Sequence, residues 1–216
     1  MQCIIQARMS SSRLPGKSLI PINGITLLER VFARLEQSKA LNKIIVATSD
    51  HQSDDPIEEF CESKKFAYHR SSLNNVYKRF IDTLETFPAK SFVRTCADSP
   101  LLDAKLIDLA VCKFHEGDYD LVTNTFPRTY PKGQSVEVID TSVFYNTFKR
   151  ITLPEHREHI TKFFYDNHKE FNIHNLVNKK DYSDFNHCVD TADDLIRIEK
   201  LLKETRREQN WTDFLT

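Results

Sequence analysis

The sequence has no long apolar run. Met1 and Gln2 lead directly into Cys3-Ile4-Ile5, which is too short a hydrophobic stretch for a secretory signal peptide. No other stretch approaches the ~20 consecutive apolar residues that a transmembrane helix needs. We therefore expect a soluble, cytoplasmic protein that has no membrane partner.

Paired cysteines are also missing. The five cysteines are odd in number, widely separated and without a C-x-x-C pair. This distribution argues against a disulfide framework or a zinc ribbon and is typical of reduced thiols in a cytosolic protein. The formal net charge is only -1, so the chain as a whole does not attract nucleic acid or anionic membranes. Any site for an anion must therefore be local.

Internal repeats, low-complexity tracts and linkers rich in proline, glycine or serine are absent as well. A chain of 216 residues without such boundaries predicts one domain over residues 1–216, with ample length for a hydrophobic core. What the chain does contain is an alternation of apolar runs with amphipathic segments, which have helical spacing over residues 27–35 and 106–114. The strand-length runs are Cys3 to Ile5, Ile44 to Ala47, Phe66 to Tyr68, Phe92 to Val93, Leu121 to Val122 and Val136 to Ile139.

Strands that alternate with helices predict crossover units, and therefore an α/β fold with a mainly parallel sheet and helices on both faces. In such sheets, ligands bind at the carboxyl ends of the strands. This rule directs attention to the segments that follow the predicted strands. They are Gln6 to Lys17, Thr48 to Asp50, Thr95 to Pro100 and Asn124 to Gln134.

The C-terminal region predicts a further helix. Thr191 and Asp194 have the spacing of a capping box, so we expect the helix to begin directly after Thr191. A charged stretch over residues 204–210 then leads to Trp211 and Phe214. We expect this apolar ending to dock on the body of the protein or on a second subunit.

One short motif suggests a different class of protein. Residues 16–18 read G-K-S, the end of the phosphate-binding loop G-x-x-x-x-G-K-[ST], but Ser11 stands where that loop needs its first glycine. A P-loop holds phosphate with backbone N–H groups and turns directly into a helix. Pro15 lacks such a donor, and Pro21 prevents an immediate helix, so the next helix is expected only near Thr26. These mismatches argue against an ATP- or GTP-splitting P-loop protein.

The same segment carries three cations. Arg8, Arg13 and Lys17 lie within ten residues that contain no acidic residue, directly after a predicted strand. They suit a polyphosphate, because arginine binds phosphate oxygens in a bidentate manner and lysine acts as a mobile point charge. The serines at positions 10–12 add hydroxyl donors. The alternative is a solvated basic loop, and the position after the first strand favours the phosphate site.

A longer pattern includes this segment. Residues 4–17 read I-I-Q-A-R-M-S-S-S-R-L-P-G-K and resemble the A-R-x-x-S-x-R-L-P-G-K opening of cytidylyltransferases that make CMP-activated 3-deoxy-ulosonic acids, the Kdo and acylneuraminate type. The resemblance is closest to the SpsF-like branch, named after spore-coat polysaccharide synthesis. It continues along essentially the whole chain, through residues 44–49, 93–101, 126–138, 157–161 and 189–195.

The resemblance implies a Rossmann-like fold of the nucleotide-diphospho-sugar transferase type. It also implies transfer of CMP from CTP to an acceptor oxygen, release of pyrophosphate and a homodimer. By the same resemblance, the nucleotide loop falls on Ala7, Arg8, Ser11, Arg13 and Lys17.

The resemblance places the magnesium ligands on Asp98 and Asp190. Attack on the α-phosphorus of CTP builds negative charge, so catalysis depends on positioning and electrostatic stabilisation. Magnesium favours the carboxylate ligands that two aspartates from separate loops supply. Arg8, Lys17 and Asp98 are therefore the candidate catalytic residues. The alternatives are that Asp98 shapes a turn and that Asp190 stabilises a helix N-terminus.

Further candidates complete the nucleotide site. In the resembling family, the region of Arg70 and Ser71 approaches the cytosine and ribose, and we assign Thr95 to the same site. Arg70 can either read the cytosine carbonyl or form a surface ion pair with the helix that carries Glu58 to Glu62, and the sequence leaves both open. Arg94 matches a position that is usually arginine in the SpsF-like branch, with a functional or a structural role.

Residues 125–140 resemble the acceptor-facing part of the family, and we expect them to form an acceptor or dimer element. The branch commonly reads G-L-D-V-E where this chain has G-Q-S-V-E at residues 133–137, which leaves the acceptor open. His156 and His159 stand three residues apart, but the sequence offers no further ligands for a zinc site. The chain also departs from the branch at Asn75, Ala97, Ser99 and Ser135. The candidate acceptor-binding residues are Gln134, Glu137, Arg157 and His159.

We therefore predict a magnesium-dependent cytidylyltransferase that activates an acidic sugar for surface polysaccharide synthesis. An alternative keeps CTP but uses a phosphorylated alcohol or an amino-acid derivative, which gives a CDP-linked product. A glycosyltransferase normally carries a D-x-D pair, and Cys96 and Pro100 occupy the two positions where a partner for Asp98 would stand. A non-catalytic nucleotide-binding protein has no need for two metal carboxylates beside a phosphate site.

Overall fold

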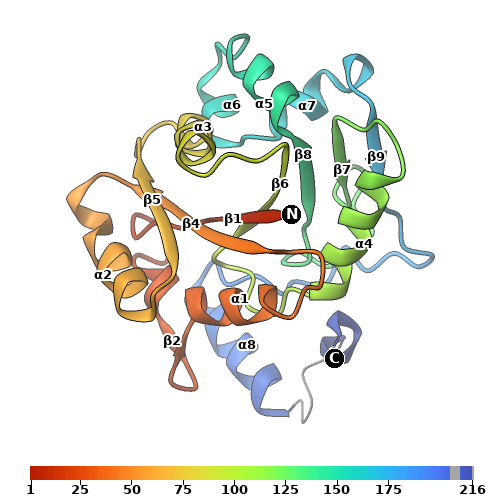
Figure 1. The fold of residues 1–216 in the computed structure, drawn as a ribbon. Coiled ribbons are helices and arrows are strands. Elements are labelled where there is room, and N and C mark those ends of the chain that lie inside the picture. Colours follow the sequence, from red (N-terminus) through yellow and green to blue (C-terminus); the bar gives the residue numbers. More distant parts are fainter. Residues whose placement is uncertain (205–209, 216) are drawn as a thin grey trace.

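Seven strands form one mixed sheet in the structure, a computed structural model that describes residues 1–204 and 210–215. The strand order is β5-β4-β1-β6-β8-β7-β9 (Figure 1). Strand β8 runs antiparallel to β6 and β7, and the other neighbouring pairs are parallel. The strands are β1 Gln2–Gln6, β4 Lys43–Ser49, β5 Ala67–Ser71, β6 Ser91–Cys96, β7 Leu121–Thr123, β8 Glu137–Asp140 and β9 Ile173–Asn175.

All six apolar runs overlap strands of this sheet, so the predicted α/β fold with a mainly parallel sheet is confirmed. The strands extend beyond the runs because polar residues continue the backbone ladder. Strand β6, for example, adds residues 94–96 to the predicted Phe92 and Val93. Strand β9 lies outside the prediction, because its sequence Ile173-His174-Asn175 contains one apolar residue and pairing with β7 forms it.

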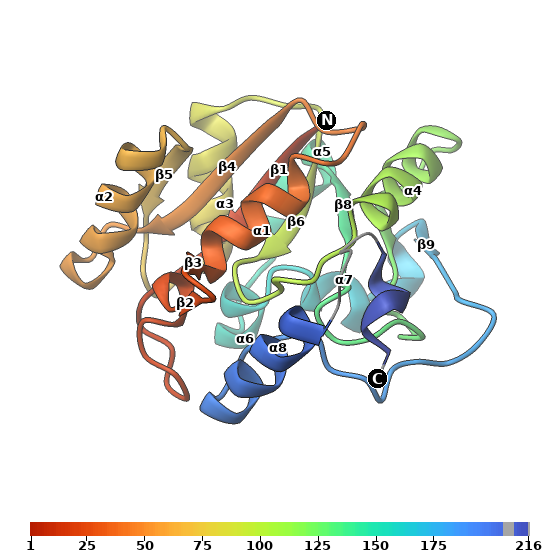
Figure 2. The same ribbon diagram turned by 90° about the horizontal axis from the view of Figure 1, so that it is seen from below.

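Helices cover both faces of the sheet because successive strand residues point to opposite faces. On β1, Cys3 and Ile5 pack against one group of helices, and Ile4 packs against the other. Figure 2 shows the first face, with α1 and α4 lying in front of the strands. That face is covered by α1 (Leu27–Leu35), α2 (Asp55–Lys64) and α4 (Ala104–His115). The other face carries α3 (Val76–Thr86), α5 (Thr141–Phe148) and α7 (Lys162–Asp166), and the short helix α6 (Pro154–Glu158) packs against α3 and α7.

The segment after β1 does not form a P-loop. A single 3-10 turn, η1 (Lys17–Leu19), follows Gly16, and the chain then forms a small hairpin of β2 (Pro21–Ile22) and β3 (Ile25–Thr26). Helix α1 starts only after this hairpin, with the Thr26 hydroxyl accepting from the Glu29 N–H at 3.2 Å. A P-loop lysine is followed directly by an α-helix. No α-helix directly follows Lys17 in residues 17–26, as predicted.

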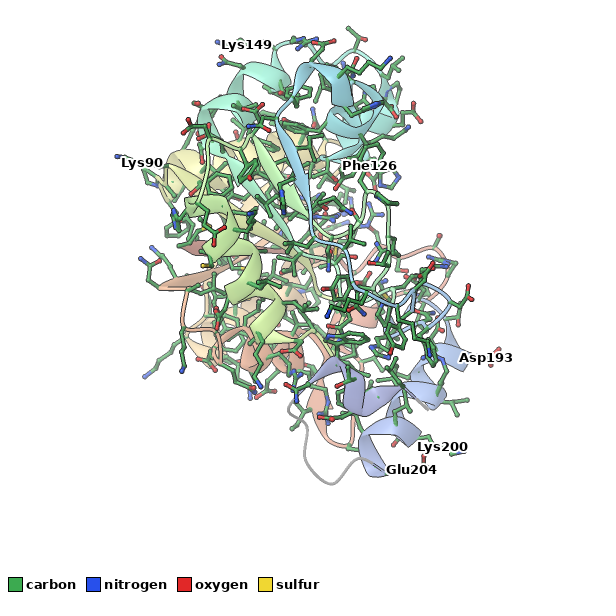
Figure 3. The ribbon with its side chains drawn as sticks, turned by 90° about the vertical axis from the view of Figure 1, so that its right-hand side faces the viewer. Lys90, Phe126, Lys149, Asp193, Lys200 and Glu204 are labelled. Carbon is green, nitrogen blue, oxygen red and sulfur yellow. The ribbon has the colours of Figure 1, made fainter. Side chains whose placement is uncertain are left out.

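The C-terminal helix α8 (Ala192–Glu204) belongs to a third, smaller core. Its apolar residues Ile198, Leu201 and Leu202 pack with Ile22 of the hairpin and with Val189, which precedes the helix. Asp193, Lys200 and Glu204 lie on its outer side (Figure 3). This core brings the start of α8 next to the segment that contains Lys17, as the site below requires.

Two details of the C-terminal region match the sequence. The Thr191 hydroxyl accepts from the Asp194 N–H at 3.2 Å, and the Asp194 carboxylate accepts from the Thr191 N–H at 3.0 Å, which confirms the capping box. Trp211 and Phe214 of η4 (Trp211–Phe214) are buried against the same chain, although the charged residues 205–209 before them lie outside the described residues. Among the described helices, none has the length and apolarity needed to cross a membrane.

Candidate active site

A cavity of about 320 Å³ lies at the edge where the parallel strands β1 and β6 end. A larger cavity of about 540 Å³ at the opposite edge, lined by Lys43, Lys90 and His115 among others, contains none of the predicted site residues. The smaller cavity is therefore the candidate active site. It is lined by Gln6, Arg8, Ser11, Ser12, Arg13, Lys17, Ser18, Arg94, Cys96, Ala97, Asp98, Glu158, His159 and Asp190.

The loop after β1 is held in place by its backbone. Ala7 extends the strand, since its N–H donates to the Ala47 carbonyl at 3.1 Å. The Met9 N–H donates to the carboxylate of Asp54 at 2.7 Å, and the Ser18 hydroxyl donates to the Arg8 carbonyl at 3.1 Å. Asp54 is fully buried and also accepts from the backbone N–H and the hydroxyl of Ser49. These bonds fix the point from which the three predicted cations project.

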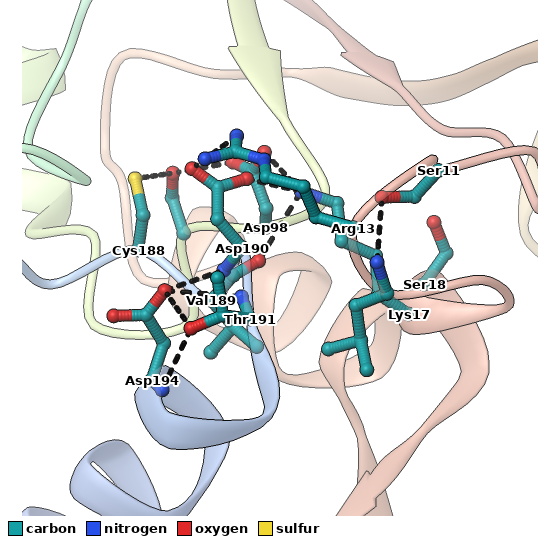
Figure 4. Close-up of polar contacts among 12 residues, drawn as sticks. Ser11, Arg13, Lys17, Ser18, Asp98, Cys188, Val189, Asp190, Thr191 and Asp194 are labelled. Atoms are coloured by element: carbon teal, nitrogen blue, oxygen red, sulfur yellow. Dashed lines mark hydrogen bonds and ion pairs between the residues drawn. The ribbon is translucent and has the colours of Figure 1, made fainter.

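Each of these cations is paired with a carboxylate in the cavity. Arg8 lies 2.8 Å from Glu158, and Arg13 lies 3.0 Å from Asp190. The Lys17 ammonium lies 2.9 Å from Asp98 and 2.8 Å from Asp190. Figure 4 shows Arg13, Lys17 and the two aspartates converging from separate segments.

Lys17 is the least exposed of the three, with 15% of its side chain accessible against 34% for Arg8 and 63% for Arg13. Burial lowers the pKa of the Lys17 ammonium, but the charges of Asp98 and Asp190 and their hydrogen bonds outweigh burial and raise the pKa above its ordinary value. Lys17 is therefore a full cation at neutral pH.

Backbone contacts bring the two aspartates together although they are far apart in the sequence. The Val189 N–H donates to the Asp98 carbonyl at 2.9 Å, which fixes the segment before α8 against the segment after β6. The carboxylate of Asp194 in the capping box accepts from the Asp190 N–H at 3.1 Å. Ser99, one of the departures from the resembling branch, donates its hydroxyl proton to Asp98 at 3.1 Å.

This cluster fits a divalent metal ion. Oxygen atoms of Asp98, Asp190 and the Val189 carbonyl all lie within 3.2 Å of one cationic atom, the Lys17 Nζ. Carboxylate and carbonyl oxygens are the ligands that Mg²⁺ prefers in proteins. The chemistry of the donor set therefore matches the predicted role of the two aspartates as magnesium ligands.

Arg94 and Cys96 of β6 line the floor of the cavity. The Arg94 guanidinium donates to the Glu137 carboxylate at 3.0 Å and to the Gln6 side-chain oxygen at 3.2 Å, so a buried acid balances its charge. Burial raises the pKa of the Cys96 thiol to about 11, so Cys96 is a neutral thiol and not a thiolate nucleophile.

The remaining nucleotide candidates lie outside the residues that line this cavity. Arg70 pairs with Asp55 at 2.6 Å and also with Glu58, so the ion-pair interpretation of Arg70 is the one that the structure shows. The Ser71 hydroxyl donates to a carboxylate of α3, and Thr95 is buried with its hydroxyl 3.6 Å from the Cys3 sulfur. The Arg70 guanidinium also donates to the backbone carbonyls of Ser49 and His51.

The acceptor candidates are divided. His159 lines the cavity, whereas Arg157 is exposed and does not. Gln134 is completely buried: its amide donates to the Leu101 carbonyl at 2.7 Å and accepts from the Asp103 N–H at 3.0 Å, so it acts in the core here and not at the cavity surface. Glu137 is buried as the partner of Arg94 and does not line the cavity.

The two neighbouring histidines do not share surroundings. His156 is buried and pairs with Asp166 at 2.8 Å, while His159 is exposed toward the cavity. Ligand atoms of Glu155, His156 and Asp166 lie within 4.8 Å of one another, but the Lys162 ammonium already contacts Asp166 at 2.9 Å. Unlike Asp98 and Asp190, which an ammonium also contacts, these three residues do not line the cavity of the candidate site.

Sequence reasoning did not assign several residues that line the cavity, among them Glu158, Gln6 and Ser18. Glu158, the partner of Arg8, stands between two residues that we did consider, and its charge opposite a basic loop was the available signal. Gln6 ends β1 directly before the recognised motif, and nothing in its residue type marks it as part of a site. Asp54, which holds Met9, was also missed because its role depends on a contact across 45 positions of the sequence.

Comparison with known proteins identifies related chains. A family model described as Cytidylyltransferase matches residues 2–214. The chain is 32% identical over 167 residues to the spore coat polysaccharide biosynthesis protein SpsF of Bacillus subtilis, which covers 74% of this chain and 68% of that protein. It is 32% identical over 125 residues to the 8-amino-3,8-dideoxy-manno-octulosonate cytidylyltransferase of Shewanella amazonensis, covering 56% of this chain and 50% of that protein. A solved structure of a cytidylyltransferase from Leptospira borgpetersenii superimposes with a TM-score of 0.94 at 30% identity, over 99% of this chain and 92% of that chain.

Proposed function

This chain belongs to the cytidylyltransferase family of CTP-dependent nucleotidyltransferases, and we propose that it transfers CMP from CTP to an oxygen of an acidic sugar of the 3-deoxy-ulosonic acid type. In this reaction an acceptor hydroxyl oxygen bonds to the α-phosphorus of CTP. The bond between the α-phosphorus and the bridging oxygen of the β-phosphate breaks. Pyrophosphate leaves, and the hydroxyl proton is released to solvent.

One observation carries the proposal. The cationic loop after β1 and the two aspartates meet in one cavity, with the Lys17 ammonium within 2.9 Å of both carboxylates. Catalysis of phosphoryl-group transfer consists largely of positioning and electrostatic stabilisation, for which cations and a carboxylate-bound metal are the usual means.

Each side chain then has a defined task. Arg8, Arg13 and Lys17 bind the β- and γ-phosphates and stabilise the charge that develops on departing pyrophosphate. Asp98 and Asp190 would hold Mg²⁺, which would neutralise phosphate charge and lower the pKa of the attacking hydroxyl group. The hydroxyl groups of Ser11 and Ser12, which line the same cavity, supply further donors to the phosphates.

The acidic acceptor is supported by two facts. The relative from Shewanella amazonensis is named for an eight-carbon dideoxy sugar acid, so acceptors of this type occur within the family. His159 and Arg94 line the cavity of this chain and can donate to an anionic group. The alternative, a phosphorylated alcohol or amino-acid derivative that gives a CDP-linked product, would use the same donors.

The biological setting follows from the chemistry. Activated sugar acids feed the synthesis of surface polysaccharides, and the similarity to SpsF supports this destination. CTP and reduced cysteines coexist in the cytoplasm, which we propose as the location. A homodimer, with residues 125–140 contributing to the acceptor site or to the dimer contact, completes the proposal.

Pyrophosphate release tests this function directly. The enzyme is incubated with Mg²⁺ and CTP against a panel of acidic sugars, phosphorylated polyols and amino-acid derivatives, with ATP, GTP and UTP as nucleotide controls. We expect release to require CTP and an acidic sugar, and mass spectrometry to detect a CMP-linked product. A CDP-linked product would support the alternative acceptor, and preference for a purine triphosphate would contradict the proposed function.

A further inference from the structure

In this structure the phosphate-binding cations of the loop after β1 are neutralised by the acids around them. Arg13 contacts Asp190, and Lys17 contacts both Asp98 and Asp190. Two positive and two negative side chains leave this group of four without a net charge. A polyanion such as the triphosphate of CTP is therefore attracted far less than three cations in one loop would suggest.

Lys17 is the central member because its hydrogen bonds are saturated. An ammonium group has three N–H donors. The Lys17 Nζ lies 2.9 Å from an Asp98 oxygen, 2.8 Å from an Asp190 oxygen and 3.2 Å from the Val189 carbonyl oxygen (Figure 4). These three acceptors use all of its protons. Lys17 must therefore give up at least one of these contacts before it can donate to a phosphate oxygen.

We infer that the Lys17 ammonium and the divalent cation of the proposed reaction compete for the carboxylates of Asp98 and Asp190. When the cation binds, Lys17 is released from the aspartates and becomes available to the phosphates. This inference rests on the proposed function, because it assigns the two aspartates to a metal ion. It gives Lys17 a second role, as the cation that occupies the two carboxylates until the metal binds.

The backbone around Lys17 allows its side chain to move while the loop stays in place. The Lys17 N–H donates to the Leu14 carbonyl at 3.2 Å, and the Lys17 carbonyl accepts from the Ile20 N–H at 3.1 Å. The adjacent Ser18 is buried and bonded to the Arg8 carbonyl. Exchange between aspartates and phosphates therefore needs only rotation of the four-carbon side chain, which is fast compared with loop or domain motion.

Competition has a consequence that is measurable without nucleotide. If Lys17 occupies the carboxylates that bind the cation, its removal must strengthen cation binding, although the same change weakens catalysis. A general gain in negative charge would strengthen cation binding too. Arg8 provides the matched control, since it contributes one positive charge to the same cavity but pairs with Glu158 and with neither aspartate.

The experiment measures Mn²⁺ binding to the full chain in the absence of CTP, by electron paramagnetic resonance of free Mn²⁺. We expect Lys17→Met to bind Mn²⁺ about tenfold more tightly than the wild type, and Arg8→Met to change the affinity by less than about threefold. Equal Mn²⁺ affinities of the wild type and Lys17→Met would overturn the inference. An equal gain in both variants would also overturn it, because the effect would then be one of net charge.

A second measurement uses the unmodified chain and so does not depend on the folding of a variant. Lysine side chains are acetylated with a limiting amount of an amine-reactive reagent, with and without Mg²⁺. Mass spectrometry then measures the extent of acetylation at each lysine. We expect Mg²⁺ alone to raise the labelling of Lys17 several-fold relative to Lys43, which lies at the opposite edge of the sheet. Unchanged relative labelling would overturn the inference. Both experiments omit CTP and acceptor, so they decide this point separately from the pyrophosphate assay that decides the proposed function.

Discussion

Lys17 and Asp98 place opposite charges 2.9 Å apart, and each charge has its own task in the proposed reaction. We expect Lys17→Ala and Asp98→Asn each to reduce the rate of pyrophosphate release by roughly 10²-fold or more, the scale for loss of one preorganised electrostatic group. Lys90→Ala is the control, because Lys90 is exposed and lines the cavity at the opposite edge. Rates close to wild type for Lys17→Ala or Asp98→Asn, with CTP and the true acceptor, would remove that residue from the site.

Asp54 is expected to act through the loop and not on the substrate. One carboxylate oxygen of Asp54 accepts from the Met9 N–H and the other accepts from the Ser49 donors, so asparagine, which keeps a single acceptor oxygen, leaves one of these sets without a partner. A buried unsatisfied group costs about 1–3 kcal/mol. The loop that carries the phosphate-binding cations then loses its anchor. We expect Asp54→Asn to raise the KM for CTP by roughly three- to tenfold with a smaller change in kcat.

Glu59→Gln serves as the control for Asp54→Asn. Glu59 is exposed and lies in α2, the helix that begins directly after Asp54. Steady-state kinetics over a range of CTP concentrations separates KM from kcat. A fall in melting temperature without any change in the KM for CTP would show that Asp54 is structural only.

Arg8, Arg13 and Lys17 were predicted as neighbours from a dense local pattern, whereas Asp98 and Asp190 were assigned to the same site by the resemblance to cytidylyltransferases. The structure brings all five residues into one cavity. The predicted site residues that do not line the cavity are those whose surroundings depend on tertiary packing. A local sequence pattern contains no information about such packing. Gln134 looks like a polar loop residue in the sequence, but its amide satisfies buried backbone groups of the segment after β6.

Among the elements, the segment before β8 depends on Gly133. Its φ of +89° is in the left-handed region, and a Cβ at this position would lie 2.6 Å from the carbonyl carbon of His187. We expect Gly133→Ala to lower the free energy of unfolding by about 2–4 kcal/mol, from backbone strain together with the forced shift of residue 187. Denaturant unfolding measures the change.

Gly24 in the β2–β3 hairpin is the matched control for Gly133. Its φ is +78°, but a Cβ there meets no atom within 4 Å. Gly24→Ala should therefore show the strain alone, about 1–2 kcal/mol. Equal losses for the two variants would contradict the close approach between Gly133 and the segment at His187.

His187 links the same segment to the C-terminal turn η4. Burial lowers the pKa of its imidazole from 6.5 to about 4, and the ring accepts from the Gln134 amide and donates to the Phe214 carbonyl. Because the folded-state pKa is depressed, the unfolded chain binds the proton first as pH falls. The folded protein therefore loses stability between pH 6.5 and about 4.

The expected loss from His187 is about 2 kcal/mol between pH 7.5 and pH 5. Denaturant unfolding at the two pH values measures it, with His187→Gln as the variant that removes the titrating group and His115→Gln as an exposed control. We expect the pH dependence to become shallower in His187→Gln and to stay unchanged in His115→Gln. Equal slopes for all three proteins would show that His187 does not titrate in this range.

At the scale of the whole molecule, the spacing of apolar residues predicted the sheet and its two helical layers. The strands are buried on both faces and therefore contain runs of consecutive apolar residues. The spacing did not predict that β8 is antiparallel or that β9 forms an edge strand of the sheet. The direction of a strand and its pairing partner are decided by connections between distant segments. The sequence did not predict the third core either, in which α8 packs on the hairpin. This packing brings Asp190 next to Lys17.

The central claim is that one edge of this sheet holds a metal ion between two distant aspartates and a triphosphate on the loop after β1. Anomalous diffraction from crystals soaked with Mn²⁺ and CTP tests it most directly. The account predicts an anomalous peak bonded to the carboxylates of Asp98 and Asp190, with phosphate density at Arg8, Arg13 and Lys17. A peak remote from those two aspartates, or a triphosphate bound away from that loop, would contradict it.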